Sequence, residues 1–185
     1  MPKKPIDVAW MFPQLDEIRD ATLKAKVVEI LNELWAMSEF EDIATVPSSG
    51  DIPYPNLPHS RSVLTLCLQV ADTFERYHGV KVDRDVLIAA AILQDASKVV
   101  EYRPKAGGGV ERTKIGTTYG HAFWVTMLAA QKGLPEAVSH ILLTHSPQAA
   151  KFPASLEGKI IYYVDQLDVI AIHGDHWVKE SIIRK

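Results

Sequence analysis

The chain has 185 residues, of which 47 % are hydrophobic and 23 % charged, and its formal net charge is −3. This length and composition are typical of one globular domain, so we expect residues 1–185 to form a single soluble domain. The lack of a basic excess argues against a nucleic-acid partner. A single cysteine, Cys67, excludes a disulfide within the chain and is typical of a reducing cytoplasm. No apolar run is long enough for a membrane span or a signal peptide, so we expect a cytoplasmic protein.

Apolar residues recur with helical spacing along most of the chain. A first helix is predicted at about 15–40, within an N-terminal helical extension that covers residues 1–46. The prolines from Pro47 to Pro58 predict a loop. Further helices are predicted at about 59–78, from a cap at Asp83 through the apolar stretch 86–93, and at about 120–131, 135–145 and 156–172. No segment shows convincing strand periodicity, so we predict an all-α fold, with a mobile loop or small hairpin after Tyr102.

Six polar residues lie in or beside apolar helical stretches, where an uncompensated charge is costly. They are His59, Gln94, Asp95, His121, His145 and Asp165. A single histidine on an apolar face is more often a hydrogen-bonded core residue than a ligand, and a single aspartate is more often a cap or an ion-pair partner. Five imidazoles and carboxylates on five helical segments are harder to explain in this way. Together they favour a metal site.

The segments around these residues resemble the motifs of the HD-domain superfamily. Residues 90–102 read AAILQDASKVVEY and resemble its central motif, in which a buried helix ends in His-Asp and a lysine often follows three residues later. The segment PHSRSV at 58–63 resembles the one with the first histidine, and those around His121, His145 and Asp165 resemble the third histidine, the fourth histidine and the closing aspartate. The resemblance covers about residues 57–170, the expected HD core. It implies an all-α bundle of five to seven helices around a metal site.

The presence of both later histidines points to the branch of the superfamily that binds two metals. That branch includes dinucleoside-polyphosphate hydrolases and also di-iron oxygenases that act on inositol or phosphonates. By position, the resemblance implies one metal held by His59, Gln94, Asp95 and Asp165, and a second held by Asp95, His121 and His145, with Asp95 bridging the two. The expected cofactors are therefore one or two divalent transition metals, namely Fe, Mn, Co or Zn.

Two cations near these residues are candidates for binding an anionic small-molecule substrate. Lys98, one turn beyond Asp95, would offer a charge to an anionic group or to the leaving oxygen, and with Asp95 it is the expected catalytic residue. A solvated lysine at a helix end explains Lys98 equally well from sequence alone. Arg61 would likewise hold an anion or form a salt bridge.

Gln94 departs from the superfamily pattern, because its neutral amide oxygen is a weaker donor than imidazole for these metals. It would ligate weakly and retune the metal, or abolish the first site while the second survives, or be a substitution that silences an enzyme. We rank a retained but altered site first. The leading function is a metal-dependent hydrolase of small phosphorylated or otherwise anionic metabolites. A di-iron oxygenase and a catalytically weakened protein that binds a ligand are the alternatives, and a homodimer stays open.

Overall fold

The protein's structure, a computed structural model, describes residues 3–50 and 54–173. The described residues are mostly helical, which confirms the predicted all-α class. The longer helices are α2 (Ala21–Met37), α3 (Asn56–His78), α4 (Arg84–Leu93), α7 (His121–Gln131), α8 (Glu136–Thr144) and α9 (Leu156–His173). The short elements are helices α1 (Val8–Met11), α5 (Lys98–Glu101) and α6 (Lys114–Thr118), the 3-10 turns Pro13–Glu17 and Ile43–Thr45, and strands β1 (Tyr102–Pro104) and β2 (Val110–Arg112). Within the described ranges, no helix has the length and apolar character needed to cross a membrane.

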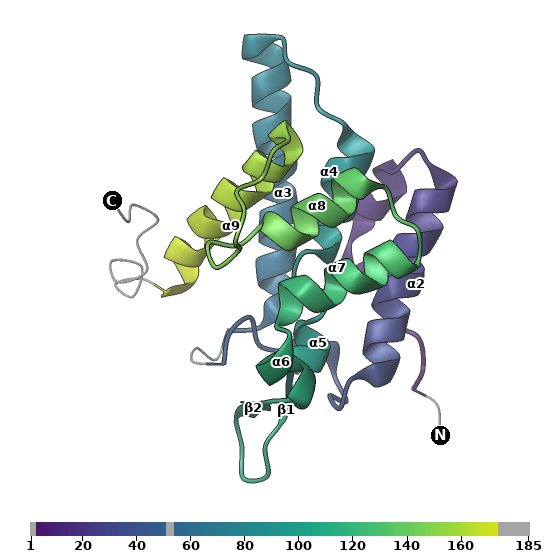
Figure 1. The fold of residues 1–185 in the computed structure, drawn as a ribbon, viewed down its shortest axis with the longest axis vertical. Coiled ribbons are helices and arrows are strands. Elements are labelled where there is room, and N and C mark those ends of the chain that lie inside the picture. Colours follow the sequence, from purple (N-terminus) through teal and green to yellow (C-terminus); the bar gives the residue numbers. More distant parts are fainter. Residues whose placement is uncertain (1–2, 51–53, 174–185) are drawn as a thin grey trace.

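Helix α4 lies at the centre of the bundle. Its residues from Val86 to Leu93 are all buried, as their uninterrupted apolar run predicts, and the helix contacts α2, α3, α8 and α9. Its start agrees with the sequence, because the Asp83 side chain accepts a hydrogen bond from the Val86 amide at 3.2 Å. Figure 1 shows α7 and α8 packed side by side, with α3 and α9 forming a second contacting pair. Helix α4 therefore ends, at Gln94, in the interior of the molecule.

The first long helix is shorter than predicted, because α2 begins at Ala21 and not near residue 15. The Asp20 side chain accepts a hydrogen bond from the Thr22 amide at 2.8 Å, so Asp20 caps the helix and sets its start. The preceding residues Pro13–Glu17 form a 3-10 turn instead.

The loop predicted between Pro47 and Pro58 ends earlier than expected. Helix α3 begins at Asn56, so Pro58 lies in its first turn, where a missing backbone N–H costs nothing. Residues 51–53 of the predicted loop lie outside the described residues. The earlier start places His59 on a helix, buried, instead of at a helix end.

The segment after Tyr102 forms the small hairpin that was one of the two predicted outcomes. Strands β1 and β2 are antiparallel, with Tyr102 opposite Arg112. The connecting glycines Gly107, Gly108 and Gly109 all have positive φ, a conformation that side chains other than glycine rarely adopt. The hairpin places Tyr102 and Arg112 next to each other at its base.

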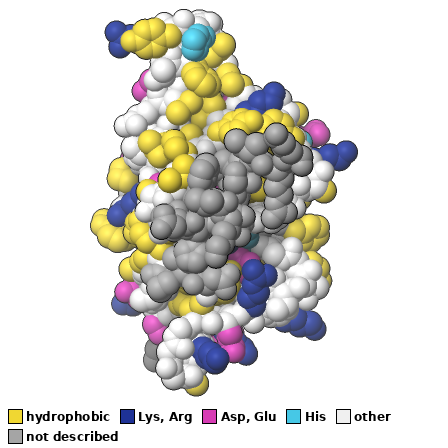
Figure 2. Space-filling view, turned by 90° about the vertical axis from the view of Figure 1, so that its left-hand side faces the viewer, with side chains coloured by type: hydrophobic (Ala, Val, Ile, Leu, Met, Phe, Trp, Pro, Cys, Tyr) yellow, Lys and Arg dark blue, Asp and Glu magenta, His cyan; other side chains and the backbone are white. Residues whose placement is uncertain are grey.

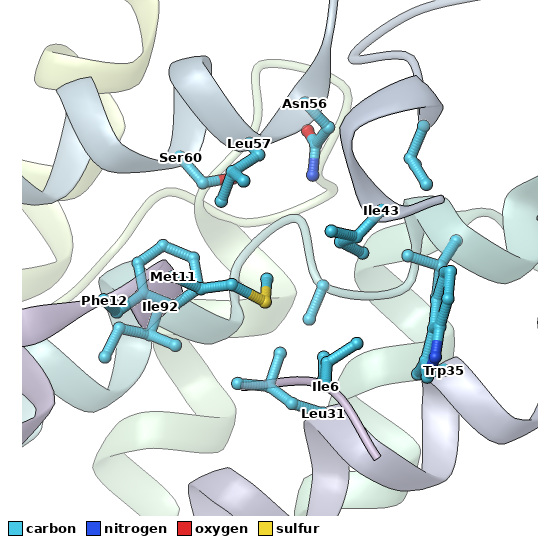
Figure 3. Close-up of a pocket in the computed structure, with 13 residues that line it drawn as sticks. Ile6, Met11, Phe12, Leu31, Trp35, Ile43, Asn56, Leu57, Ser60 and Ile92 are labelled. Carbon is cyan, nitrogen blue, oxygen red and sulfur yellow. The ribbon is translucent and has the colours of Figure 1, made fainter. Parts of the chain in front are cut away.

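A small cavity lies between the N-terminal segment and the bundle (Figure 3). Its volume is about 30 Å³, and Figure 3 shows Met11 and Trp35 on opposite sides of it and Asn56 at its edge. Such a volume holds roughly two water molecules and excludes a metabolite. The Asn56 amide donates to the Asp95 carbonyl at 3.3 Å, while the Asn56 Oδ1 atom is buried without a partner. This cavity is therefore too small to be a substrate pocket, and Asn56 at its edge holds the backbone of Asp95.

Candidate metal centre and pocket

Five of the six candidate residues meet in two clusters that share Asp95. One cluster contains His59, Asp95 and Asp165, the other contains Asp95, His121 and His145, and within each the donor atoms lie within 4.8 Å of one another. The segments that supply them are far apart in the chain: the first turn of α3, the turn after α4, the first residue of α7, the C-terminal end of α8 and the middle of α9. The bundle thus brings together residues that are spread over about a hundred positions of sequence.

The two oxygens of Asp95 face different clusters. Oδ2 lies 3.3 Å from the His59 Nε2 atom, which is also 3.1 Å from the Asp165 Oδ1 atom. Oδ1 lies 3.3 Å from the His121 Nε2 atom and 3.9 Å from that of His145. Donors bound side by side at about 2.1 Å from a six-coordinate ion are about 3.0 Å apart, so most of these spacings suit one ion per cluster. One carboxylate oxygen per cluster is also the arrangement that a bridging ligand requires.

In the first cluster, the His59 ring is held from behind by a second carboxylate. Its Nδ1 atom donates to the Asp168 Oδ2 atom at 2.7 Å, and the Ser62 hydroxyl donates to the other Asp168 oxygen. A carboxylate only accepts, so Nδ1 carries the hydrogen and Nε2 faces Asp95 and Asp165. This is the outer support that metal-binding histidines usually have. The Asp165 carboxylate, on the Nε2 side of the ring, accepts a hydrogen bond from the side-chain amide of Gln166 at 3.0 Å.

In the second cluster, an acceptor lies behind the ring of each histidine. The His121 Nδ1 atom lies 3.2 Å from the Glu101 Oε2 atom, and the His145 Nδ1 atom donates to the Leu142 carbonyl at 2.8 Å. Each Nδ1 faces an acceptor, so each Nε2 is the nitrogen that faces Asp95. All three histidines therefore present the same nitrogen to the centre of the site.

Two glycines make this arrangement of Glu101 and His121 possible. A Cβ on Gly116 would lie 2.3 Å from the Glu101 carbonyl oxygen, so only glycine allows α6 to pack so closely on α5. Gly120 has a φ of 73°, which turns the chain into α7 directly before His121.

The electrostatics of the two clusters follow from burial and from these contacts. Burial disfavours the charged His59 ring, but the carboxylates of Asp165, Asp168 and Asp95 outweigh it and raise the pKa of His59 far above its usual range. Burial would raise the pKa of Asp95, yet Lys98 and the rings of His59 and His121 hold it well below its usual range. Burial and the nearby His121 lower the pKa of His145, so its ring is neutral. The negative charge of Asp95 is thus fixed.

Lys98 is buried, which excludes the solvated lysine that the sequence left open. Its Nζ atom lies 3.2 Å from the Glu101 Oε2 atom, and it lines the pocket described below. Burial lowers the pKa of Lys98, but Asp95 and Glu101 outweigh it and raise the pKa above the ordinary value. Lys98 is therefore a charged ammonium group inside the site.

Gln94 is completely buried, and both atoms of its side-chain amide lack a hydrogen-bond partner. A buried amide without partners is costly, and native structures contain few of them. A bound ion within reach of Oε1 would satisfy that atom, so the orphaned amide is compatible with a metal ligand, but Gln94 does not line the cavity over the clusters and its ligand role stays a prediction.

Arg61 does not join the site. Its guanidinium donates to the backbone carbonyls of Trp10 and Met11 at 2.6 and 2.7 Å and stacks on the Trp10 ring. Arg61 is absent from the pocket lining, so the structure gives it a role in fastening α1 to α3 in place of the expected anion contact.

A cavity of about 750 Å³ opens over the two clusters. That volume is in the range of metabolite-binding pockets. Polar walls come from Lys98, Glu101, Arg112 and Lys151, and aromatic walls from Tyr119 and Phe123. Since His59, Asp95, His121, His145 and Asp165 also line it, the cavity gives a substrate access to both clusters.

Sequence reasoning missed Asp168, Ser62 and Glu101, which fix the histidine rings. Spacing offered a signal in two cases, because Asp168 lies three residues after Asp165 and Ser62 three after His59, on the same helical faces. Of the other histidines, His78 is exposed, and the ring of His140 accepts a hydrogen bond from the Ala154 backbone amide at 3.1 Å. The His173 side chain and His176 lie outside the described residues.

Comparison with known proteins gives one informative relative. The chain is 26 % identical over 162 residues to the dihydroneopterin 2',3'-cyclic phosphate phosphodiesterase of Methanocaldococcus jannaschii. The match covers 83 % of this chain and 65 % of the relative, so the chain spans slightly less than two thirds of that protein's length. No protein-family model and no solved structure matches the chain. The chain is thus similar, along most of its length, to a phosphodiesterase.

Proposed function

We propose that this protein is a metal-dependent phosphohydrolase that acts on a small phosphoester metabolite. The observation that carries the proposal is the pair of clusters that share Asp95 at the floor of a cavity containing the charged Lys98. The similarity of the chain to a cyclic phosphate phosphodiesterase supports the same class of reaction. Both the metal dependence and the substrate class belong to the proposal.

The residues present fit one or two first-row transition metals. Three imidazole nitrogens and two carboxylates form a mixed nitrogen and oxygen donor set, which suits Fe, Mn, Co or Zn better than Mg or Ca. His59, Asp95 and Asp165 would hold one ion, with the Gln94 amide as a further ligand, and Asp95, His121 and His145 would hold the other. Bound ions of this kind lower the pKa of a coordinated water and stabilise charge that develops on a phosphoryl oxygen.

The chain's own residues would perform three tasks. Asp95 stays ionised and holds the two halves of the site in register. Asp168 and Glu101 orient the rings of His59 and His121. Lys98, kept charged in the cavity wall by Asp95 and Glu101, would donate to a phosphoryl oxygen or to the leaving oxygen.

The direct test is to purify the protein without chelator, measure its metals by elemental analysis, and assay a panel of cyclic phosphodiesters and phosphomonoesters with each metal added back. We expect at least one metal per chain, metal-dependent hydrolysis, and a lower melting temperature after chelation, because a ligand of the folded state stabilises it. A protein that purifies without metal and shows unchanged stability and no hydrolysis after metal addition would contradict the proposal.

The same experiment addresses the two other functions. An iron-loaded protein with a visible absorption band in air and no phosphoester hydrolysis would favour the oxygenase. A protein that binds phosphoesters but does not turn them over would favour the weakened, ligand-binding function, for which Gln94 is the specific observation.

A further inference from the structure

Two exposed aromatic rings lie in the wall of the cavity, two residues to either side of His121. The rings of Tyr119 and Phe123 are stacked, with their centroids 5.6 Å apart and their planes 16° from parallel. The side chains are 51 % and 46 % exposed, so about half of this stacked pair faces the cavity or solvent. The Tyr119 ring also lies 5.5 Å from the Trp124 ring, tilted by 36°, so the stacked pair belongs to a group of three aromatic rings beside the second cluster.

Exposure alone does not mark a binding site on this protein. Figure 2 shows hydrophobic side chains exposed at several separate places on one face of the molecule. Phe152 and Tyr163 are as exposed as the stacked pair, at 51 % and 54 %, yet they do not line the cavity, and their rings meet edge-on at 65°. Tyr119 and Phe123 differ because they are nearly parallel and because they share a cavity with the metal-ligand candidates.

The cavity has two chemically different parts. Lys98 and Arg112 line it, and both lie close to Glu101, at 3.2 and 3.9 Å, so one part of the wall is polar and cationic. Tyr119 and Phe123 form the apolar part. A volume of about 750 Å³ is far more than a phosphate group fills. With a substrate's phosphate at Lys98, the cavity therefore still has room for a monocyclic or bicyclic ring system.

We propose that Tyr119 and Phe123 form a subsite that stacks on a planar heteroaromatic ring of the substrate. That the substrate carries a phosphoester rests on the proposed hydrolase function. That it carries a planar ring rests on the aromatic pair alone. The substrate class is then a heteroaromatic compound with a phosphoester on its side chain or sugar, and a phosphoester without a ring is a poor substrate. Stacking of a base on an aromatic side chain is worth about 1–3 kcal/mol in other proteins.

The test compares ring-bearing and ring-free ligands in Tyr119→Leu, Phe123→Leu and the control Phe152→Leu. Binding of adenosine, cytidine and pterin, none of which has a phosphoester, is measured by calorimetry on the protein as purified. Hydrolysis is measured with adenosine 2',3'-cyclic phosphate and with glycerol 1,2-cyclic phosphate. Leucine keeps apolar volume but removes the flat ring, and thermal melting checks that each variant is folded.

We expect both cavity variants to weaken binding of at least one ring compound by about fivefold or more, and to raise KM for the adenosine ester to a similar extent with little change in kcat. Turnover of the glycerol ester should stay within about twofold of wild type, and Phe152→Leu should change none of these values. If none of the three ring compounds binds, or if their binding is the same in both cavity variants as in wild type, the subsite is refuted. If ring binding falls as expected while no ester is hydrolysed by wild type, the subsite stands and the hydrolase function fails.

Discussion

The two clusters that share Asp95 have different charge and different exposure. Around His59 stand three carboxylates, Asp95, Asp165 and Asp168, and all of these side chains are buried. The other cluster contains His121 and His145 with two carboxylates, Asp95 and, behind His121, Glu101, and the cation Lys98 lies 3.2 Å from Glu101. The first cluster therefore has an excess of negative charge that a divalent cation would neutralise. The second is closer to balance and has the more exposed histidine, His121.

This difference in charge and exposure indicates that the two clusters have different roles. A cluster rich in buried carboxylates suits an ion that stays in place, because removing the ion leaves uncompensated charge in the core. A cluster with neutral His145, the partly exposed His121 and the nearby cation Lys98 suits contact with an anionic substrate. The following variants test this difference, starting with the one that we expect to affect both clusters.

The largest effect is expected from Asp95→Asn, because each oxygen of Asp95 faces a different cluster. The neutral amide removes the shared negative charge, so metal content should fall at both positions. We expect turnover to drop by at least about a thousandfold, roughly 4 kcal/mol of barrier. Elemental analysis and phosphoester hydrolysis measure the two losses. The matched control is Asp16→Asn, at a side chain that is 85 % exposed, and it should change neither. Full metal content in Asp95→Asn would show that the two clusters do not depend on a common ligand.

The next largest effect should separate the clusters. Asp165→Ala removes a carboxylate that belongs only to the His59 cluster. We therefore expect this variant to lose the metal of the His59 cluster and most of the activity. Asp165→Leu should do the same, while the metal-free protein keeps or gains stability because a buried charge is replaced by an apolar group. His145→Ala is the corresponding variant of the other cluster, and we expect it to lose the metal of that cluster. Competition with a chromogenic chelator and urea unfolding of the metal-free proteins provide the measurements. Asp165→Ala with normal metal content and full activity would make this carboxylate structural.

A smaller effect is expected from the residues behind the histidines. Asp168→Asn weakens the hold on His59, and Glu101→Gln weakens the hold on His121. Loss of such outer partners typically costs about 10- to 100-fold in metal affinity or activity. Each variant should lower the affinity of its own cluster, as measured by metal titration, and leave that of the other within about threefold. Equal losses at both clusters in both variants would mean that the two ions are not independent.

Asp168 and Glu101 also show which parts of the site could be predicted from the sequence and which could not. Polar residues on apolar helical faces indicated His59, Asp95, His121, His145 and Asp165, because a charge in a core needs a partner wherever the helices pack. The helical class followed from periodicity in the same way. Glu101 gave no such signal and Asp168 gave only its spacing from Asp165, since acidic residues are common on the exposed faces of helices. Their role depends on which ring lies opposite, and that is set by the packing of distant segments.

Local contacts also decided one helix boundary that was predicted incorrectly and two side chains whose roles the sequence left open. Asp20 caps α2 at a point where the apolar spacing continues without interruption, so periodicity alone placed the start of the helix too early. Arg61 follows His59 closely in sequence, yet its guanidinium is held by two carbonyls of the N-terminal segment. Lys98 gave an ambiguous signal, because a lysine at a helix end is usually solvated and only the tertiary packing buries it.

The smallest expected effect, and the most specific, concerns Gln94. Its amide is fully buried and has no hydrogen-bond partner, and Gln94 directly precedes Asp95 in the chain, so we expect a histidine at this position to supply a stronger donor to the His59 cluster. Gln94→His should raise the metal content of that cluster and, if the native site is a weakened hydrolase, raise turnover of phosphoesters by about tenfold, roughly 1.4 kcal/mol. The control Gln69→His adds a histidine to the exposed surface of α3 and corrects for unspecific metal uptake. If Gln94→His fills the site but slows the reaction, the glutamine is an adaptation of this protein to its own substrate. If metal content and metal affinity are both unchanged, residue 94 does not face the ions, and the His59 cluster is completed by other groups.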